Sequence, residues 1–336
     1  MDGNTVVDCI ENPLGIRSID LSKEEGFLLN GKPVQLVGKN RHQHYAYIGD
    51  ALPDSLHYKD MLQFKQMGLN IVRTAHYPQD NALLDACDEL GILVYEEAPT
   101  WIDIGNDAWF DNLEKAARRM VRNHRNHPSV IVWGGGINHR GYVPRLHYAV
   151  KEEDPTRWTG SNNAEWTGVQ NSGACDLFTN MDYGGIKDWS GKEYLLAMEG
   201  GSGQSTLEKY ASDPMRLGII AWTGHAYYTF HIGANKWNRM RSGSLDGFRT
   251  QAPPRDARFG EPVTMKLKLD MEGRTLTADG ADIVVARTRL YDAEGRIVAK
   301  SNLQVRYSVT GPASIVGDGL LKGANPIGLS RGAAPA

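Results

Sequence analysis

The chain of 336 residues has only three cysteines, no long apolar run and no strong excess of charge of either sign. Cys9, Cys87 and Cys175 are too widely spaced for a disulfide framework or a cysteine metal site. The apolar runs are far too short to cross a bilayer, so no membrane association is expected. The net charge of -3, without a basic stripe, argues against nucleic acid as a partner.

The sequence also lacks internal repeats, and its first residues have neither the basic stretch nor the apolar core of a signal peptide. We therefore expect no signal peptide in this chain, while cytoplasmic, periplasmic and secreted locations all stay open. The abrupt start resembles that of a segment cut from a longer protein. The length suffices for one large domain and a smaller one. The sequence does not indicate the oligomeric state.

Two short apolar runs, at 130–139 and 195–201, break abruptly into glycines and polar residues. Buried parallel strands have this pattern where their carboxyl ends open into loops. In a barrel of alternating strands and helices, those ends carry the chemistry. The second run places a lone carboxylate, Glu199, at such an end. A carboxylate there costs free energy unless it is hydrogen-bonded or functional, so Glu199 is either a structural or a catalytic group.

Strand and helix patterns alternate between residues 34 and 222. We expect strands at 34–38, 70–74, 92–95, 130–133, 157–162, 177–183, 195–199 and 218–222, and helices at 55–68, 80–90, 108–124 and 142–153. This alternation predicts a (β/α)8 TIM barrel of the α/β class. A doubly wound open sheet is the alternative, but it requires a glycine-rich phosphate turn after the first strand, and none is present.

The chain is expected to divide into four segments. They are 1–19 as the terminal strands of a preceding β domain, 20–245 as the barrel, 246–262 as a linker and 263–336 as a β-sandwich-like module. A hairpin with an Asn30-Gly31 turn opens the barrel segment. Period-two patterns at 265–269, 283–290 and 304–309 predict the strands of the last module. Its tail has no closing strand, which allows for an incomplete sandwich.

Five segments, in their order along the chain, resemble the catalytic barrel of glycoside hydrolase family 2, which contains β-galactosidases and β-glucuronidases. They are Arg-His-Gln-His at 41–44, Arg-Thr-Ala-His-Tyr-Pro at 73–78, Cys-Asp-Glu-Leu-Gly-Ile at 87–92, Arg-Asn-His-Pro-Ser-Val-Ile-Val-Trp at 125–133 and Met-Glu-Gly at 198–200. The resemblance covers residues 5 to about 230, and more loosely the sandwich. It implies retaining hydrolysis of β-linked sugars by two carboxylates, with Glu199 at the position of the nucleophile.

The position of the second carboxylate, the acid/base, departs from the family pattern Trp-Ser-x-Gly-Asn-Glu. Here residues 133–141 read Trp-Gly-Gly-Gly-Ile-Asn-His-Arg-Gly. Without a gap, Asn138 occupies the glutamate position; with one inserted residue, Asn138 matches the family's asparagine and His139 replaces the glutamate. We prefer the second alignment, because it preserves the asparagine that binds the sugar 2-hydroxyl in the family. Three alternatives stay open: His139 is the acid/base, Glu97 or Glu165 replaces it, or hydrolysis is impaired.

The resemblance also implies a set of residues at strand ends that contact the sugar or the nucleophile. They are His42, His44, Arg73, His76, Tyr183 and Trp222, with Glu97 and Glu165 as further candidates. Arg73 is expected to hold Glu199 ionised, Tyr183 to donate to it, and Trp222 to offer a platform for a sugar ring. The alternative is structural histidines and a core tryptophan.

No metal and no cofactor is predicted. Galactosidases of the family hold Mg²⁺ through a Glu and a His after the third strand, together with the acid glutamate. Residues 99–103 read Pro-Thr-Trp-Ile-Asp and lack that pair. Of the adjacent Glu96 and Glu97, at most one faces the pocket. The chain is therefore expected to be a β-glycosidase with a carbohydrate substrate, most similar to β-galactosidases. A carbohydrate-binding protein without full hydrolytic function is the alternative, and a transglycosylase would use the same residues.

Overall fold

The structure is a computed structural model. It describes residues 6–9, 14–45, 48–99, 101, 104–137, 141–142, 144–161, 174–186, 189–231, 236–241, 243–245, 258–271, 275–277, 282–298, 303 and 305–315.

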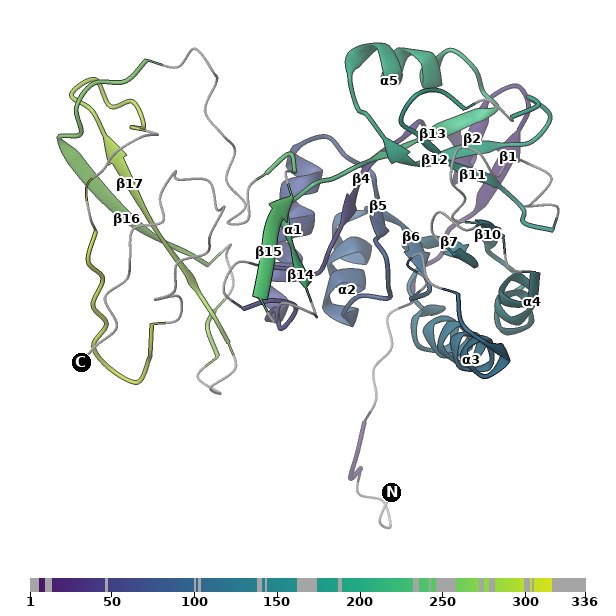
Figure 1. Ribbon diagram of the computed structural model, residues 1–336, viewed down its shortest axis with the longest axis horizontal. Helices are drawn as coiled ribbons and strands as arrows, with labels where there is room; N and C mark the ends of the chain where they lie inside the picture. The colour runs from purple at the N-terminus through teal and green to yellow at the C-terminus, as the bar shows by residue number, and fades with distance from the viewer. Residues whose placement is uncertain are drawn as a thin grey trace. The chain divides into compact units, whose positions relative to one another are not determined.

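The chain forms two compact units, Met1–Arg41 with Met61–Trp222, and His42–Asp60 with Thr223–Ala336. Figure 1 shows the elements of both. The domain boundaries expected at residues 19, 245 and 262 stay a prediction, and most of the expected linker lies outside the described residues.

The first unit is built on eight parallel strands. In sheet order they are β10 (Trp158–Gly160), β7 (Val130–Gly134), β6 (Leu93–Glu97), β5 (Ile71–Thr74), β4 (Leu36–Arg41), β13 (Arg216–Ala221), β12 (Leu195–Gly200) and β11 (Phe178–Asp182). Where the two end strands meet, Leu177 N donates to Thr159 O over 3.1 Å, and Ser161 N donates to Thr179 Oγ1 over 2.7 Å. These bonds bring the sheet nearly to a closed ring, and the predicted (β/α)8 barrel is confirmed.

Helices follow the strands and cover the sheet (Figure 1). They are α1 (Asp54–Gln66), α2 (Asn81–Leu90), α3 (Asp107–His124), α4 (Pro144–Glu153) and α5 (Gln204–Ala211). Local sequence fixes their ends: Asp80 accepts from Ala82 N at the start of α2, and Gly91 ends it with a φ of 67°. The first four helices lie within two residues of their predicted bounds at every end.

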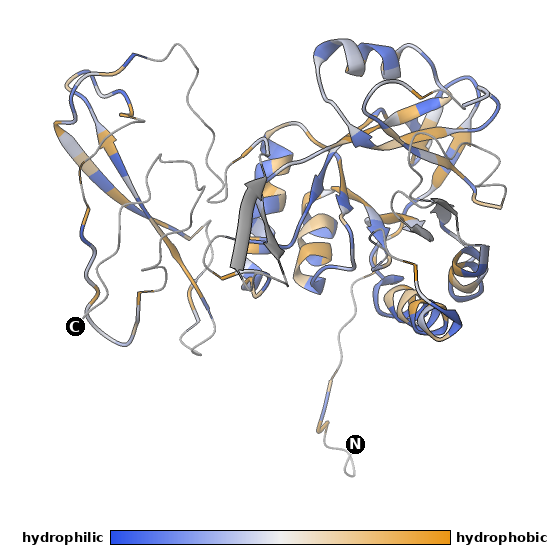
Figure 2. Ribbon diagram, viewed as in Figure 1, coloured by the Kyte–Doolittle hydropathy of each residue, from blue (hydrophilic) through white to orange (hydrophobic). Residues whose placement is uncertain are grey.

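The barrel interior is apolar because alternate residues of each strand point inward. Leu36, Ile71, Tyr95, Ile131 and Leu196 belong to one fully buried cluster. Many residues of these strands are accordingly drawn in the hydrophobic colour in Figure 2. A small antiparallel sheet contributes its own residues to this cluster; it consists of β1 (Ile19–Ser22), β2 (Gly26–Leu29) and β3 (Lys32–Pro33). The predicted hairpin turn is confirmed, with positive φ at Asn30 and Gly31.

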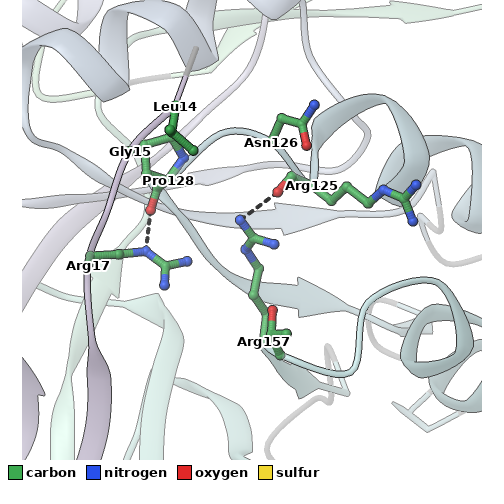
Figure 3. A pocket seen from close by; sticks show the side chains of 8 residues that line it. Leu14, Gly15, Arg17, Arg125, Asn126, Pro128 and Arg157 are labelled. Atoms are coloured by element: carbon green, nitrogen blue, oxygen red, sulfur yellow. Dashed lines mark hydrogen bonds between the residues drawn. The ribbon is translucent and has the colours of Figure 1, made fainter. Parts of the chain in front are cut away.

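Two arginines bind backbone carbonyls at the end of the barrel where the strands begin. Arg17 donates from Nε to Pro128 O and from Nη2 to Val130 O, the latter over 2.7 Å. Arg157 also donates to Val130 O, over 2.7 Å, and to Arg125 O, over 2.8 Å. They line a cavity of about 390 Å³ (Figure 3). Burial and the nearby charge of Arg157 lower the pKa of Arg17 to about 10.

Replacing Arg17 by Ala is expected to lower the melting temperature by ~3–6 °C. The half-buried Pro128 carbonyl loses its charged donor and the Val130 carbonyl loses one of two, which costs ~1–2 kcal/mol. Thermal unfolding followed by circular dichroism measures the change. Arg119→Ala, which removes an exposed arginine from α3, is the control. Equal melting temperatures for the two variants would contradict a pinning role for Arg17.

The second unit contains two antiparallel hairpins. The first joins β14 (Tyr227–His231) and β15 (Lys236–Arg241), and the second joins β16 (Thr264–Asp270) and β17 (Val285–Tyr291). The expected strands at 265–269 and 283–290 correspond to β16 and β17, so C-terminal β structure is confirmed. The expected strand at 304–309 is wrong for the residues described there, because 305–309 pair with no other strand. The sequence analysis did not anticipate β14 and β15.

Candidate active site

The carboxyl ends of the parallel strands meet at one rim of the barrel, and Glu199 lies there. It is the penultimate residue of β12, a strand buried over its whole length, and only 3% of Glu199 is exposed. The next residue, Gly200, has a φ of 147°, and a Cβ there would lie 2.5 Å from Asp182 O of β11. Only glycine fits this close approach without strain, so the Glu-Gly pair fixes how the strand presents its carboxylate.

Arg73 of β5 binds one oxygen of this carboxylate. Its Nη1 donates to Glu199 Oε1 over 2.8 Å and to Asn40 Oδ1 over 2.8 Å, while Nη2 lies 2.7 Å from Glu97 Oε2. All of Arg73 is buried. Burial alone lowers the pKa of the guanidinium, but the carboxylates of Glu97 and Glu199 outweigh burial and raise it. Arg73 is therefore a permanent cation beside Glu199.

Tyr183 binds the other oxygen. It follows β11, and its hydroxyl donates to Glu199 Oε2 over 2.8 Å, although 56% of the residue is exposed. Each carboxylate oxygen of Glu199 thus has a donor, one from a buried cation and one from a phenol at the rim. Two such donors fix the orientation of the carboxylate.

His76 and Trp222 form an aromatic pair next to this cluster. Their rings stack with centroids 5.2 Å apart and an angle of 11° between planes. His76 Nδ1 lies 3.3 Å from Glu97 Oε2 and 3.3 Å from Arg73 Nη2. Trp222 is partly exposed. The pair therefore links a partly accessible indole to the charged network, a composition suited to contact with a sugar ring and its hydroxyls.

The adjacent carboxylates of β6 face opposite sides, as expected. Glu97 is fully buried and ion-paired with Arg73. Glu96 lies 2.5 Å from His124 Nδ1 of α3, and burial raises its pKa. Because Glu97 already binds the buried cation Arg73, the geometry favours a role for Glu97 in this ion-pair network over a role as the substitute acid/base.

Five predicted site residues are not among the contacts described above. His42 and His44 belong to the second unit, where His42 stacks on Tyr227 with centroids 4.3 Å apart and His44 Nδ1 lies 3.3 Å from Asp50. Asn138, His139 and Glu165 lie outside the described residues.

Asn40 of β4 was not anticipated from the sequence. Its amide donates to Met198 O and to Ile220 O, each over 2.8 Å, and its side-chain oxygen accepts from Arg73. It therefore ties the strand that carries the nucleophile candidate to its neighbours. The only signal in the sequence was a lone asparagine near the end of an apolar strand. Asparagine is depleted in β-strands, so its presence at this position is unusual.

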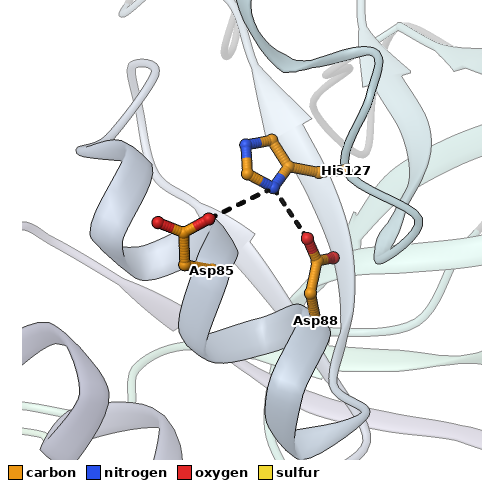
Figure 4. Close-up of side chains that lie close together, drawn as sticks. All are labelled: Asp85, Asp88 and His127. Carbon is orange, nitrogen blue, oxygen red and sulfur yellow. Dashed lines mark hydrogen bonds and ion pairs between the residues drawn. The ribbon is translucent and has the colours of Figure 1, made fainter. Parts of the chain in front are cut away.

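Among the described residues, one group has the composition of a metal site: Asp85, Asp88 and His127 (Figure 4). Asp88 Oδ2 lies 2.7 Å from His127 Nδ1, and Asp88 Oδ1 accepts from Ser129 N over 2.9 Å. Asp85 is more distant, 3.9 Å from His127, and its side chain is 63% exposed. Asp88 thus orders the chain just before β7, at the opposite end of the strand from the Glu199 rim.

Within the described residues, no helix is long and apolar enough to span a membrane.

Comparison with known proteins gives the family. The family model described as "Glycosyl hydrolases family 2, TIM barrel domain" matches residues 19–199, and "Glycoside hydrolase family 2 C-terminal domain 5" matches 267–324. A β-galactosidase of Thermoanaerobacterium thermosulfurigenes is 43% identical over 162 residues, 47% of this chain and 22% of that protein. A putative β-glucuronidase of Formosa agariphila is 40% identical over 217 residues, 59% of this chain and 26% of that protein.

A solved structure described as "Bacteroides uniformis beta-glucuronidase 2 covalently bound to cyclophellitol-6-carboxylate aziridine" matches with a TM-score of 0.60 and 28% identity. The match covers 72% of this chain and 36% of that one. The chain spans about a quarter of the length of the two curated relatives. Because the barrel model matches more than half of its residues, the chain belongs to glycosyl hydrolase family 2.

Proposed function

We propose that this chain is the catalytic barrel of a retaining β-glycosidase that acts on β-galactosides, with Glu199 as its nucleophile. The observation that carries the proposal is the carboxylate of Glu199, held at the strand rim of a family 2 barrel by Arg73 and Tyr183. A nucleophile in this mechanism must be fixed in direction, and these two donors hold the carboxylate in place.

In the first step, a carboxylate oxygen of Glu199 attacks the anomeric carbon while the bond to the leaving oxygen breaks. The bonding electrons go to that oxygen, which takes a proton from the acid/base. In the second step, water attacks the anomeric carbon of the glycosyl ester, gives its proton to the same acid/base and releases Glu199 as a carboxylate. We assign the acid/base to the Asn138-His139 position, with His139 as the group that carries the proton.

The stacked His76 and Trp222 are proposed to contact the sugar. Trp222 offers a partly exposed ring, and the histidine beside it contacts the network that holds Glu199. A galactoside is taken as the first substrate because a β-galactosidase is 43% identical over 162 residues, while the putative β-glucuronidase, 40% identical over 217 residues, makes a uronide the second.

Hydrolysis of four aryl glycosides tests this proposal: the 2,4-dinitrophenyl β-galactoside, β-glucuronide, β-glucoside and β-mannoside. We expect turnover, with the highest kcat/KM on the galactoside. Release of dinitrophenolate is read by absorbance. A preference for the glucuronide would replace the proposed sugar and keep the mechanism.

A carbohydrate-binding role without hydrolysis is the second candidate, favoured by the absence of the family's glutamate after β7. In that case none of the four glycosides is hydrolysed, while galactose or lactose still binds in calorimetry.

A further inference from the structure

We propose that Glu97 is a positioning residue for the nucleophile, acting through Arg73 rather than on the substrate. This inference rests on the proposed function of Glu199. It differs from the expectation that Glu97 contacts the sugar or replaces the missing acid.

The first step of the argument is the division of Arg73 between two carboxylates. Its Nη2 faces Glu97 Oε2 at 2.7 Å, and its Nη1 faces Glu199 Oε1 at 2.8 Å. The side chains of Arg73 and Glu97 are fully buried, and that of Glu199 is 5% exposed. A planar guanidinium fixed at one nitrogen has little freedom at the other. Glu97, together with Asn40 at Nη1, therefore sets where Nη1 lies, and with it the direction of the Glu199 carboxylate.

The second step concerns charge. One guanidinium between two carboxylates gives the three groups a net charge of −1, whereas Arg73 with Glu199 alone would be a neutral pair. Part of the attraction of Arg73 is directed toward Glu97. The nucleophile consequently keeps electron density that a bidentate, undivided contact with arginine would withdraw.

The third step is the link to the aromatic pair. Glu97 Oε2 lies 3.3 Å from His76 Nδ1, and the His76 ring stacks on Trp222. One carboxylate thus contacts both the cation that holds the nucleophile and the histidine that supports the proposed sugar platform. A proton donor to the leaving oxygen would instead have to face the substrate, and Glu97 is fully buried.

The test is Glu97→Gln, with Glu96→Gln as the matched control from the same strand. Glu96 is equally buried but pairs with His124 on the outer side of the barrel. On dinitrophenyl β-galactoside we expect kcat of Glu97→Gln to fall by ~10–10²-fold with KM nearly unchanged, because misplaced reacting groups act on the transition state. Glu96→Gln is expected to stay within about threefold of the wild type.

Two further outcomes decide between roles. The fall in kcat/KM should be the same for good and poor aryl leaving groups; a loss that grows with the pKa of the leaving phenol would make Glu97 the acid/base and overturn the inference. Equal effects of the two variants would reduce Glu97 to a structural residue.

Failure of the proposed function is seen separately. If the wild type hydrolyses none of the four glycosides, a crystal structure of Glu97→Gln still tests the inference. We then expect Arg73 to turn away from Asn40 and to bind Glu199 with both Nη atoms. An unchanged Arg73 in that structure would refute the positioning role.

Discussion

Replacing Glu199 by Gln is expected to reduce kcat on dinitrophenyl β-galactoside by roughly 10⁴–10⁶-fold, the order of loss on removal of a covalent nucleophile. An amide does not form the glycosyl ester. It also removes the negative charge that Arg73 faces, because one carboxylate oxygen of Glu199 accepts from Arg73 and the other accepts from Tyr183. A glutamine keeps one acceptor for Arg73 and turns an amide N–H toward the Tyr183 hydroxyl, which then accepts instead of donating.

Two measurements make this prediction sharp. A 2-deoxy-2-fluoro-β-galactosyl fluoride should label the wild type at Glu199, located by mass spectrometry of the peptides. Added azide should restore turnover to Glu199→Gly and give the α-glycosyl azide, because the small anion attacks from the face that the carboxylate has vacated. The control is Glu208→Gln, an exposed position on α5. Labelling at another carboxylate, or a Glu199→Gln enzyme within tenfold of the wild type, would remove Glu199 from the mechanism.

The part of this site that the sequence predicted is the part fixed by strand direction. Glu199 ends an apolar run, and Arg73 ends another. Because all eight strands run parallel, both side chains had to arrive at the same rim. No side-chain contact was needed for that inference, only the position of each residue along its strand.

What the sequence did not predict depends on contacts between strands distant in the chain. Asn40 binds the carbonyls of Met198 and Ile220, which lie more than 150 residues away, and nothing local to Asn40 indicates them. The role of Glu97 depends on its distance from Arg73, which alternation along one strand does not give. β15 was likewise missed, because the Arg- and Asn-rich segment at 236–241 lacks the apolar alternation of a half-buried strand.

The second large effect is expected in the dependence of the rate on the leaving group. The family's acid glutamate follows the strand that corresponds to β7, and this chain has no carboxylate between Trp133 and Tyr142. The flanking strands β8 (Gly136–Ile137) and β9 (Gly141–Tyr142) pair with each other, and residues 138–140 between them lie outside the described part of the chain. A dinitrophenolate leaves without a proton, whereas a sugar alkoxide needs one. General acid assistance contributes ~10²–10⁴-fold. Without a working acid, kcat/KM on dinitrophenyl β-galactoside is therefore expected to exceed that on lactose by at least this factor, whereas with His139 as the acid/base the dependence on the leaving group should be shallow.

Variants at the two remaining candidates then identify the group that transfers the proton. If His139 is the acid/base, His139→Ala lowers the rate on lactose sharply and leaves the rate on the dinitrophenyl substrate nearly unchanged. The variant also shifts the limbs of the pH profile of the rate, because imidazole titrates near neutral pH. If Glu165 has this role, Glu165→Gln produces that pattern and His139→Ala is nearly silent. Inert dinitrophenyl substrates would favour the carbohydrate-binding function, because the nucleophile alone suffices to cleave them. Rapid hydrolysis of lactose that is insensitive to Asn138→Ala, His139→Ala, Glu97→Gln and Glu165→Gln would place the proton donor elsewhere and contradict the assignment of this loop.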